Sequence, residues 1–297
     1  MAFDLKSASY CGAFRVPAFV LHVDDPPSLL PTDISKYAWS ARRRYPPFAT
    51  IPGKGWARSC WAEAVHRLLS RGMKKASAVV VTSKASASEV EQLYGIQPEI
   101  VRLGIRLPKR LAGPEMRLPS PVVFLSVGRL ERNKRVDWIL KALKILESSQ
   151  PPLSARVDWR LHIVGEGSQK IPLMELCTAL GFGCRVTFHG FVSEQQLEAI
   201  YKMAHIFLMP AVQGYGIPAL EALARRVAVV LSRESRVSEV FEQSSAVRIV
   251  ENGEGELAQG ILGMVEHLQE GGLRGNSWPT IRADNDWVQE IAGICDW

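Results

Sequence analysis

The amino-acid sequence predicts an α/β protein built on parallel sheets, with a complete second half and an incomplete first half. From Pro121 onward, six apolar runs of strand length alternate with amphipathic helical stretches. This alternation is typical of a doubly wound parallel sheet. Before Pro121 we find only three strand-like runs, about half of what an independent doubly wound domain has. The first domain therefore lacks strands, which precede Met1 or come from another chain.

The elements of the first half are few. Strands are predicted at 16–22, 77–83 and 98–103, and helices at 58–75 and 86–94. The stretch 107–121 is rich in proline and charge, which favours a linker between the two halves.

The second half reads as a complete Rossmann-like domain. Its predicted strands are 122–127, 159–164, 185–192, 205–210, 227–231 and 246–250, and its predicted helices are 135–146, 171–180, 193–204, 217–224, 238–243 and 256–268. Ser193 and Gln196 have the spacing of a capping box at the start of the third of these helices.

Composition narrows the class of protein. The 297 residues are 47% hydrophobic and 22% charged, as in soluble globular proteins. No apolar run approaches the ~18 residues that span a bilayer, and the start shows no secretory signal, so we expect a cytoplasmic protein. The five cysteines are odd in number and form no C-x-x-C pair. This pattern argues against a disulfide framework or a zinc site, and we expect buried thiols at Cys177 and Cys184.

Positive charge is concentrated in the first half. Met1–Arg117 carries 18 Lys and Arg against 9 Asp and Glu, whereas the remainder carries 18 against 21. The helix predicted at 58–75 combines regularly spaced apolar residues with several cations. It could lie on an anionic membrane or meet an acidic substrate, or it is a core helix with a solvated face. No signature of a nucleic-acid-binding module is present, so we expect no nucleic-acid partner.

Loops after the strands of the second half are the candidate binding sites, because open α/β sheets bind ligands beyond the carboxyl ends of their strands. After 122–127, Arg129 and Lys134 precede a helix that begins near Val136. Two cations beside the amino end of a helix suit a diphosphate. The alternative is an exposed basic turn.

Two further loops contain glycines. Gly165 and Gly167 follow the second strand, a weak pattern that is often only a turn. After 205–210, Gly214 and Gly216 allow the backbone to approach a ligand, and Pro218 suits a first helical turn. Glu221 is then near enough to bind a diol, unless it only favours the amino end of the helix.

His22 ends the predicted strand 16–22 and is followed by two aspartates. A histidine at this position can contact substrate or act as a base. The alternative is a structural histidine.

Taken together, "SVGRLERNKRVD", "HIVGEGS", "VTFHGFVSEQQLEAIYKMA", "GYGIPALEALA" and "VAVVLS" resemble the family 4 (group 1) glycosyltransferases. These are retaining enzymes of the GT-B fold that use nucleotide sugars and need no metal or other cofactor. The resemblance implies two Rossmann-like domains facing a cleft, the first incomplete. It divides the chain into 1–117 (partial acceptor-side domain), 118–275 (nucleotide-sugar-binding domain) and 276–297, a helix that crosses back to the first domain.

The resemblance also implies residue roles. Arg129 and Lys134 match the pair that binds the donor diphosphate, and Glu221 matches the glutamate that binds the ribose. Donor-binding residues further include Gly165, Gln213 and Gly214, and the backbone of Tyr215, Gly216 and Ile217 matches the loop that contacts sugar and phosphate. His22 and Gln213 match the positions beside the reacting sugar.

Several positions depart from the family pattern. Gln213 stands where the family has a glutamate, and as a neutral amide it cannot stabilise positive charge on the sugar. Arg226 and Ala228 replace a glycine and a proline, and Ser235 and Arg236 replace a Gly-Gly pair.

We therefore predict a glycosyltransferase that moves a hexosyl unit, such as mannosyl or glucosyl, from a nucleotide sugar to a glycan or lipid-linked acceptor. Its basic first half would associate with the inner, anionic face of a membrane. The alternatives are a catalytically degenerate nucleotide-sugar-binding protein, a partner subunit of a split glycosyltransferase and, third, a sugar-nucleotide epimerase.

Overall fold

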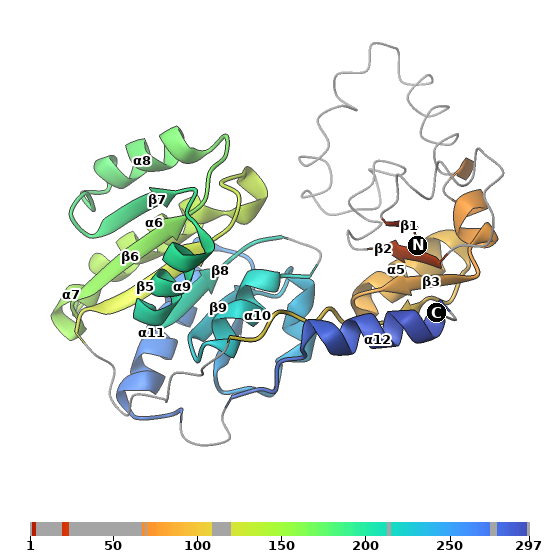
Figure 1. The fold of residues 1–297 in the computed structure, drawn as a ribbon. Helices are drawn as coiled ribbons and strands as arrows, with labels where there is room; N and C mark the ends of the chain where they lie inside the picture. The colour runs from red at the N-terminus through yellow and green to blue at the C-terminus, as the bar shows by residue number, and fades with distance from the viewer. Residues whose placement is uncertain are drawn as a thin grey trace, which may run out of the picture. The chain divides into compact units, whose positions relative to one another are not determined.

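The computed structural model describes residues 2–3, 20–23, 67–68, 70–108, 120–212, 215–273 and 278–295. The chain forms two units (Figure 1). Unit 1 comprises 1–104, 213–215 and 282–297, and unit 2 comprises 105–212 and 216–281. The predicted boundaries near 117 and 275 lie outside the described residues.

Unit 2 contains a six-stranded parallel sheet. Its strands are β5 (Val122–Val127), β6 (Trp159–Val164), β7 (Val186–Gly190), β8 (Ile206–Met209), β9 (Ala228–Ser232) and β10 (Val247–Val250). The strand order is β10-β9-β8-β5-β6-β7, so the order reverses between the neighbours β5 and β8. This is the doubly wound topology that the alternating apolar runs predict.

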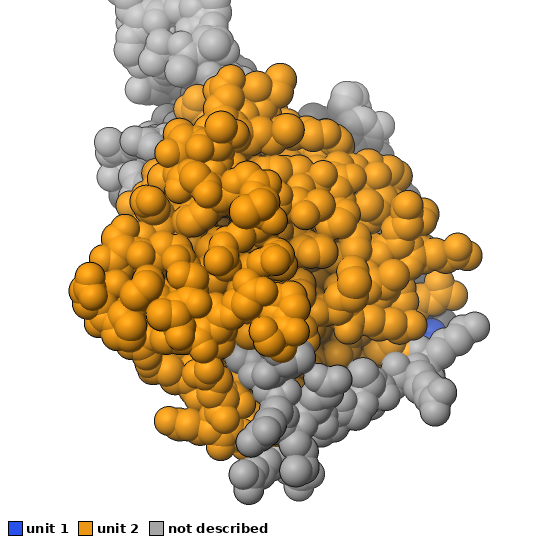
Figure 2. All heavy atoms as spheres, turned by 90° about the vertical axis from the view of Figure 1, so that its left-hand side faces the viewer, with its two compact units in different colours: residues 1–104, 213–215, 282–297 blue, residues 105–212, 216–281 orange. Residues whose placement is uncertain are grey.

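Helices cover both faces of this sheet. They are α6 (Val136–Glu147), α7 (Leu153–Arg156), α8 (Lys170–Ala179), α9 (Glu194–Met203), α10 (Ile217–Ala224) and α11 (Glu254–Gln269). The main core lies between the sheet and α6, α8 and α11, around the fully buried Trp159 and Phe124. On the other face, Tyr201 of α9 packs against Phe207 of β8, with ring centroids 6.3 Å apart. Figure 2 shows one face of unit 2 with its atoms drawn as spheres.

Local sequence signals set several ends of these helices. The predicted capping box is confirmed: the N–H of Gln196 donates to Ser193 Oγ, and the N–H of Ser193 donates to Gln196 Oε1. The helix predicted at 238–243 is wrong, because the chain forms instead the short 3-10 helix η3 (Arg236–Val240). The four-residue α7 was not predicted, since it is too short to show a helical period.

The described residues of unit 1 form a four-stranded parallel sheet in the order β1-β2-β3-β4, where the sequence predicted three strands. The strands are β1 (Ala2–Phe3), β2 (Val20–Val23), β3 (Ala78–Val81) and β4 (Glu99–Ile100), and α5 (Lys84–Tyr94) follows β3. β1 has only two residues, too few to form a recognisable apolar run. Within the described part of this unit, the strand order shows no reversal.

The last helix, α12 (Asp284–Ile294), belongs to unit 1. Its buried Ile291, with Trp287 and Ile294 beside it, packs against Val20 and Val80 of the sheet. A Cβ on Gly104 would lie 1.9 Å from the carbonyl oxygen of Ala283, so the chain can approach the helix start closely only because residue 104 is glycine.

The basic helix predicted at 58–75 is described in part. Residues 67–68 and 70–75 are helical, and Met73 is buried in the core of unit 1. Met73 therefore belongs to a core-facing side of this helix. Among the described residues, no helix is long and apolar enough to cross a membrane.

Candidate functional site

The reversal of strand order places the candidate site of unit 2 at the carboxyl ends of β5 and β8. Chain leaving β5 continues to β6 on one side, and chain leaving β8 continues to β9 on the other. The loops that leave two such strands diverge, and ligands bind at this switch point in open α/β sheets. The loops that leave β5 and β8, 128–135 and 210–216, therefore form the candidate site.

The first loop carries both predicted cations. Arg129 is exposed directly after Gly128, and Lys134 ends the short 3-10 helix η2 (Arg132–Lys134), two positions before α6. Both lie in the loop that leads from β5 to the amino end of a twelve-residue helix, where backbone N–H groups carry partial positive charge. This combination suits an anion with two phosphates.

Glu131 lies between these cations in sequence, but its carboxylate binds Ser168 in the next loop. Ser168 Oγ donates to Glu131 Oε2 at 2.7 Å, and the Ser168 N–H donates to Oε1 at 3.2 Å. These hydrogen bonds, more than the charge of Arg129, hold the pKa of Glu131 below its ordinary value. Glu131 therefore stays ionised and joins two loops of the site.

Gly165 lies where the loop after β6 meets the loop after β5. Its φ is +132°, and a Cβ there would lie 1.9 Å from the carbonyl oxygen of Gly128. The backbones are joined by hydrogen bonds from the Gly128 N–H to the Val164 carbonyl (3.0 Å) and from the Leu130 N–H to the Glu166 carbonyl (2.8 Å). The close packing against Gly128 therefore requires a glycine at position 165, independently of any contact with a nucleotide sugar.

Arg135 is a central residue that sequence reasoning missed. Its side chain is 2% exposed and pairs with Glu234 Oε2 at 2.5 Å. Nη1 donates to Asn252 Oδ1 at 3.0 Å and to the Pro210 carbonyl at 3.3 Å, and the guanidinium lies 4.2 Å from the ring centroid of Trp138. Burial lowers the pKa of Arg135, and the charge of Glu234 opposes this shift.

These contacts join the segments that follow four strands, namely β5, β8, β9 and β10. Arg135 also has a φ of +52°, which L-residues rarely adopt. Neither burial nor backbone angle can be read from "GRLERNKRVD", where Arg135 looks like one more cation of a basic turn. The only signal was the position itself, directly before a helix.

The second loop begins with three buried residues, 210–212, and is bound to the first. Asn133 Nδ2 donates to the Val212 carbonyl at 3.3 Å, and the Val212 N–H donates to the Asn133 carbonyl at 3.0 Å. Tyr215 is buried and Ile217 is exposed. Gly216 has a φ of +99° and caps α10, where Pro218 occupies the first turn as predicted. Gln213 and Gly214 lie outside the described residues.

Glu221 is the fifth residue of α10, one turn into the helix. Its Oε2 accepts a hydrogen bond from the hydroxyl of Tyr201 at 3.0 Å. Arg225 Nη1 donates to the Glu221 carbonyl at 3.0 Å, and Arg225 Nε donates to Glu198 Oε2 at 2.8 Å. Tyr201 was not among the predicted site residues, because it comes from α9 and no pattern in the sequence links it to Glu221.

The structure places Arg226, Ala228 and Ser235, three of the residues that depart from the family pattern. Arg226 has a φ of +60°, so it adopts a conformation that favours glycine. Ala228 begins the buried strand β9, and the fully buried Ser235 precedes η3.

His22 is the third residue of β2 and pairs in register with Val80 of β3. The structure describes its backbone and not its side chain. It belongs to unit 1, so its role beside the reacting sugar stays a prediction.

Two histidines, His162 of β6 and His189 of β7, lie in strands and not in these loops. His189 Nε2 lies 3.0 Å from His162 Nδ1, and burial lowers the pKa of both imidazoles. The described part of the chain contains no group of three or more His, Cys, Asp or Glu side chains that could hold a metal ion. Cys177 is buried as expected, but the expectation for Cys184 is wrong, since its side chain is exposed.

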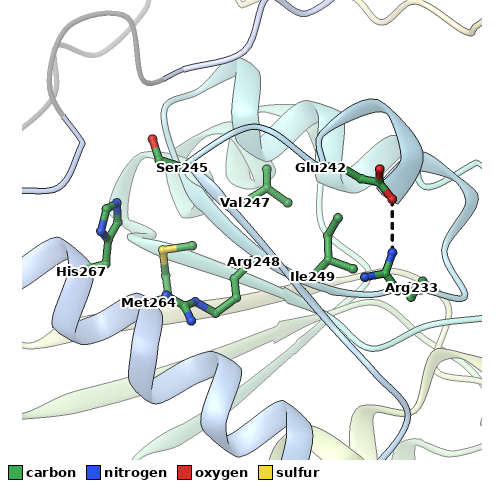
Figure 3. Close-up of a pocket in the computed structure, with 8 residues that line it drawn as sticks. All are labelled: Arg233, Glu242, Ser245, Val247, Arg248, Ile249, Met264 and His267. Carbon is green, nitrogen blue, oxygen red and sulfur yellow. Dashed lines mark hydrogen bonds and ion pairs between the residues drawn. The ribbon is translucent and has the colours of Figure 1, made fainter.

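A pocket of about 510 Å³ lies along β10, away from the switch point (Figure 3). Val247, Ile249 and Met264 line it together with Arg248 and His267. Arg233 at its end pairs with Glu242 at 3.2 Å. Because β10 is the edge strand of the sheet, this pocket belongs to the sheet edge and not to the loops described above.

Comparison with known proteins places these features in a family. Residues 116–267 match the family described as "Glycosyl transferases group 1". An uncharacterised glycosyltransferase of Methanocaldococcus jannaschii is 35% identical over 122 residues, which cover 40% of this chain and 29% of that protein. The GDP-mannose-dependent alpha-(1-6)-phosphatidylinositol dimannoside mannosyltransferase of Mycobacterium tuberculosis is 29% identical over 176 residues, 56% of this chain and 44% of that protein. The chain thus spans less than half the length of these relatives.

Solved structures share the fold. Sucrose-phosphate synthase from Thermosynechococcus elongatus matches with a TM-score of 0.73 at 16% identity, over 99% of this chain and 72% of that one. HepE from Anabaena in complex with UDP matches with a TM-score of 0.70 at 15% identity, over 100% of this chain and 79% of that one. The predicted α/β class with Rossmann-like parallel sheets and a GT-B likeness is confirmed.

Proposed function

The chain belongs to the group 1 glycosyl transferases, and from this membership we propose that unit 2 binds a nucleotide-sugar donor from which a hexosyl unit is transferred with retention. The observation that carries the proposal is the position of Arg129 and Lys134 in the loop between β5 and the amino end of α6, at the switch point of the sheet. Cations, helix end and topology indicate the same kind of ligand, a nucleoside diphosphate.

Each part of the donor has a proposed partner. Arg129 and Lys134 bind the diphosphate, and Glu221 binds the ribose hydroxyls. The backbone of Tyr215, Gly216 and Ile217, at the amino end of α10, contacts the sugar and its phosphate. Gly165 completes this set through the loop after β6. Gln213, Gly214 and His22 are proposed to lie by the transferred sugar.

The proposed chemistry depends on stabilising the leaving group. The bond between the sugar's anomeric carbon and the diphosphate breaks, and negative charge grows on the nucleoside diphosphate. Arg129, Lys134 and the amino end of α6 offset that charge where it develops. The acceptor hydroxyl bonds to the anomeric carbon from the face that the diphosphate leaves, which gives retention, and its proton passes to the oxygen of the leaving diphosphate on that face.

Thermal stability with and without nucleotides tests donor binding. We expect UDP or GDP to raise the melting temperature, because a ligand at 100 times its Kd stabilises the folded state by about 2.7 kcal/mol. Arg129→Ala and Lys134→Ala should abolish the shift. Arg132→Ala is the matched control, since Arg132 is an exposed cation of the same loop with no proposed ligand contact. A full set of nucleotide sugars and diphosphates without any shift would rule the proposal out.

The proposed acceptor is a glycan or a lipid-linked glycan. The support is the basic first half, since lipid phosphates and anionic membranes carry negative charge. Flotation with vesicles of phosphatidylglycerol tests this part. Binding at low salt that is lost at high salt is expected, whereas no binding at either salt concentration would remove the membrane from the proposal.

A second candidate function is a degenerate nucleotide-sugar-binding protein or one subunit of a split transferase. Gln213, which is neutral, favours it. So does the described part of unit 1, whose sheet shows no switch point of its own. Gln213→Glu distinguishes the two candidates. The rate of sugar transfer should rise if the neutral amide has reduced activity, and it should fall if the amide is adapted to the donor.

A further inference from the structure

The geometry points to Tyr201 as a positioning residue that holds the carboxylate of Glu221 in place for the ribose of the donor. This inference rests on the proposed role of Glu221. It adds a residue from a different helix, since Tyr201 lies in α9 and Glu221 in α10.

The hydroxyl of Tyr201 makes its short contact with Glu221. It lies 3.0 Å from Glu221 Oε2 and 3.4 Å from the carbonyl oxygen of Pro218. The side chain of Tyr201 is 1% exposed, so water does not compete for the phenol proton. A buried hydroxyl of this kind favours the observed orientation of the carboxylate, because a different orientation would leave the hydroxyl only its longer contact with the Pro218 carbonyl.

Glu221 keeps acceptor capacity for a ligand. An ionised carboxylate has two oxygens with about four lone-pair positions. Tyr201 uses one position on Oε2, and Glu221 is partly exposed. The second oxygen can therefore accept from a diol while the first is held by the phenol.

Arg225 fixes the other end of the same residue. Its Nη1 donates to the backbone carbonyl of Glu221, and its Nε pairs with Glu198. The guanidinium lies 4.8 Å from the ring centroid of Tyr201, so the ring is held as well. The charge of Arg225 is offset by Glu198, which leaves the side-chain charge of Glu221 for its ligand.

The protonation state of the phenol is compatible with this role. Burial first, and then the negative charge of Glu221, raise the pKa of Tyr201 well above its ordinary value. The hydroxyl is protonated at neutral pH and acts as the donor, and the carboxylate acts as the acceptor.

The test is Tyr201→Phe, which removes the hydroxyl and keeps the ring. Calorimetric titration compares UDP and GDP with their 2′-deoxy counterparts. The wild-type protein should bind the ribonucleotide more tightly than the deoxynucleotide. Tyr201→Phe should weaken ribonucleotide binding roughly five- to tenfold, the effect of one good hydrogen bond. It should change deoxynucleotide binding much less, so the preference for ribose shrinks.

A merely structural role of Tyr201 would weaken both nucleotides equally, so the ratio of the two affinities is the decisive quantity. Tyr94→Phe is the matched control, because it removes a hydroxyl from a buried tyrosine in the core of unit 1. Glu221→Gln should shrink the preference for ribose by itself, and adding Tyr201→Phe to it should have little further effect.

The outcomes are distinguishable. If the wild-type protein binds neither UDP nor GDP, the proposed function fails and this inference fails with it. If it binds ribo- and deoxynucleotides equally, donor binding stands but the role of Glu221 is wrong. If Tyr201→Phe keeps the full wild-type preference for ribose, donor binding and Glu221 stand and the role of Tyr201 is overturned.

Discussion

Arg135 carries a positive charge into a place where its side chain has almost no contact with water. Removing a charge from water costs several kcal/mol, and only good pairing offsets that cost. The contacts of Arg135 with Glu234, Asn252 and Trp138 supply such pairing. Arg135 therefore holds the loops of the site together, and we do not propose it as a ligand of the donor phosphates.

Arg135→Met should destabilise unit 2 strongly, because it keeps the apolar stem but leaves Glu234 without its charge partner. Breaking a buried pair costs about 3–5 kcal/mol, and since Glu234 keeps some contact with water we expect about 3 kcal/mol in urea unfolding. Adding Glu234→Gln should restore much of the loss. Arg233→Ala, which removes two exposed pairs, with Glu242 and Glu251, should cost about 1 kcal/mol or less. Equal losses of unfolding free energy for Arg135→Met and Arg233→Ala would contradict this role of Arg135.

The imidazoles of His162 and His189 make stability depend on pH. Burial lowers the pKa of both below the ordinary value of 6.5, and for His162 the charge of His189 contributes. The unfolded chain then takes up protons at a higher pH than the folded chain does. The two histidines should therefore lower the free energy of unfolding only below about pH 6.5, and the loss should grow as the pH falls further. Urea unfolding between pH 7.5 and 5.5 measures this loss, which the double variant His162→Gln, His189→Gln should reduce. The same loss in both proteins would contradict the assignment.

At the scale of elements, the loops of the site hold each other through the backbone. The loop after β5 binds the loop after β6 through Gly128 and Leu130, and it binds the loop after β8 through Asn133. The helices α6 and α10 that follow are thereby fixed at their amino ends. A ligand at the switch point would meet three loops that are already bound to one another.

Gly165→Ala should disturb this arrangement. The added Cβ would lie 1.9 Å from the Gly128 carbonyl, and the φ of +132° is unfavourable for alanine. We expect a loss of about 2–4 kcal/mol in unfolding free energy and weaker binding of UDP or GDP by calorimetry. Gly183→Ala is the matched control, since no atom lies within 4 Å of its added Cβ. A stable Gly165→Ala protein with unchanged affinity would show that the loops tolerate separation.

Sequence predicted the elements of unit 2 better than the contacts among them. β5, β6 and α10 have the residues that their apolar patterns indicate, because the period of burial is a local property. The pairing of Arg135 with Glu234 and of Tyr201 with Glu221 could not be predicted. Each depends on which strands become neighbours, and that is decided by the packing of the whole sheet.

At the scale of the whole molecule, the two ends of the described chain meet in unit 1. β1 and β2 come from its start and α12 from its end, and Ile291 of α12 packs on Val20 and Val80. The stability of unit 1 therefore depends on a helix that follows all of unit 2 in sequence. Strands at β2, β3 and β4 and a helix within 276–297 were predicted, whereas β1 was not, because it has only two residues.

Ile291→Ala should destabilise unit 1 selectively. Truncating a buried isoleucine costs about 2–5 kcal/mol, and Ile291 is buried in the core of that unit. Hydrogen exchange should become faster in β3 and remain unchanged in β6. Val288→Ala on the same helix is the control, since Val288 is exposed. Equal acceleration in both sheets would mean that the two units unfold as one.

The near-contact of Gly165 with Gly128 has a consequence for how such a site can change over generations. A longer or bulkier loop after β6 has no room unless the loop after β5 changes with it. We therefore expect the two segments to change together. A hybrid that borrows residues 128–135 from a relative should be viable only when 165–169 are borrowed from the same relative.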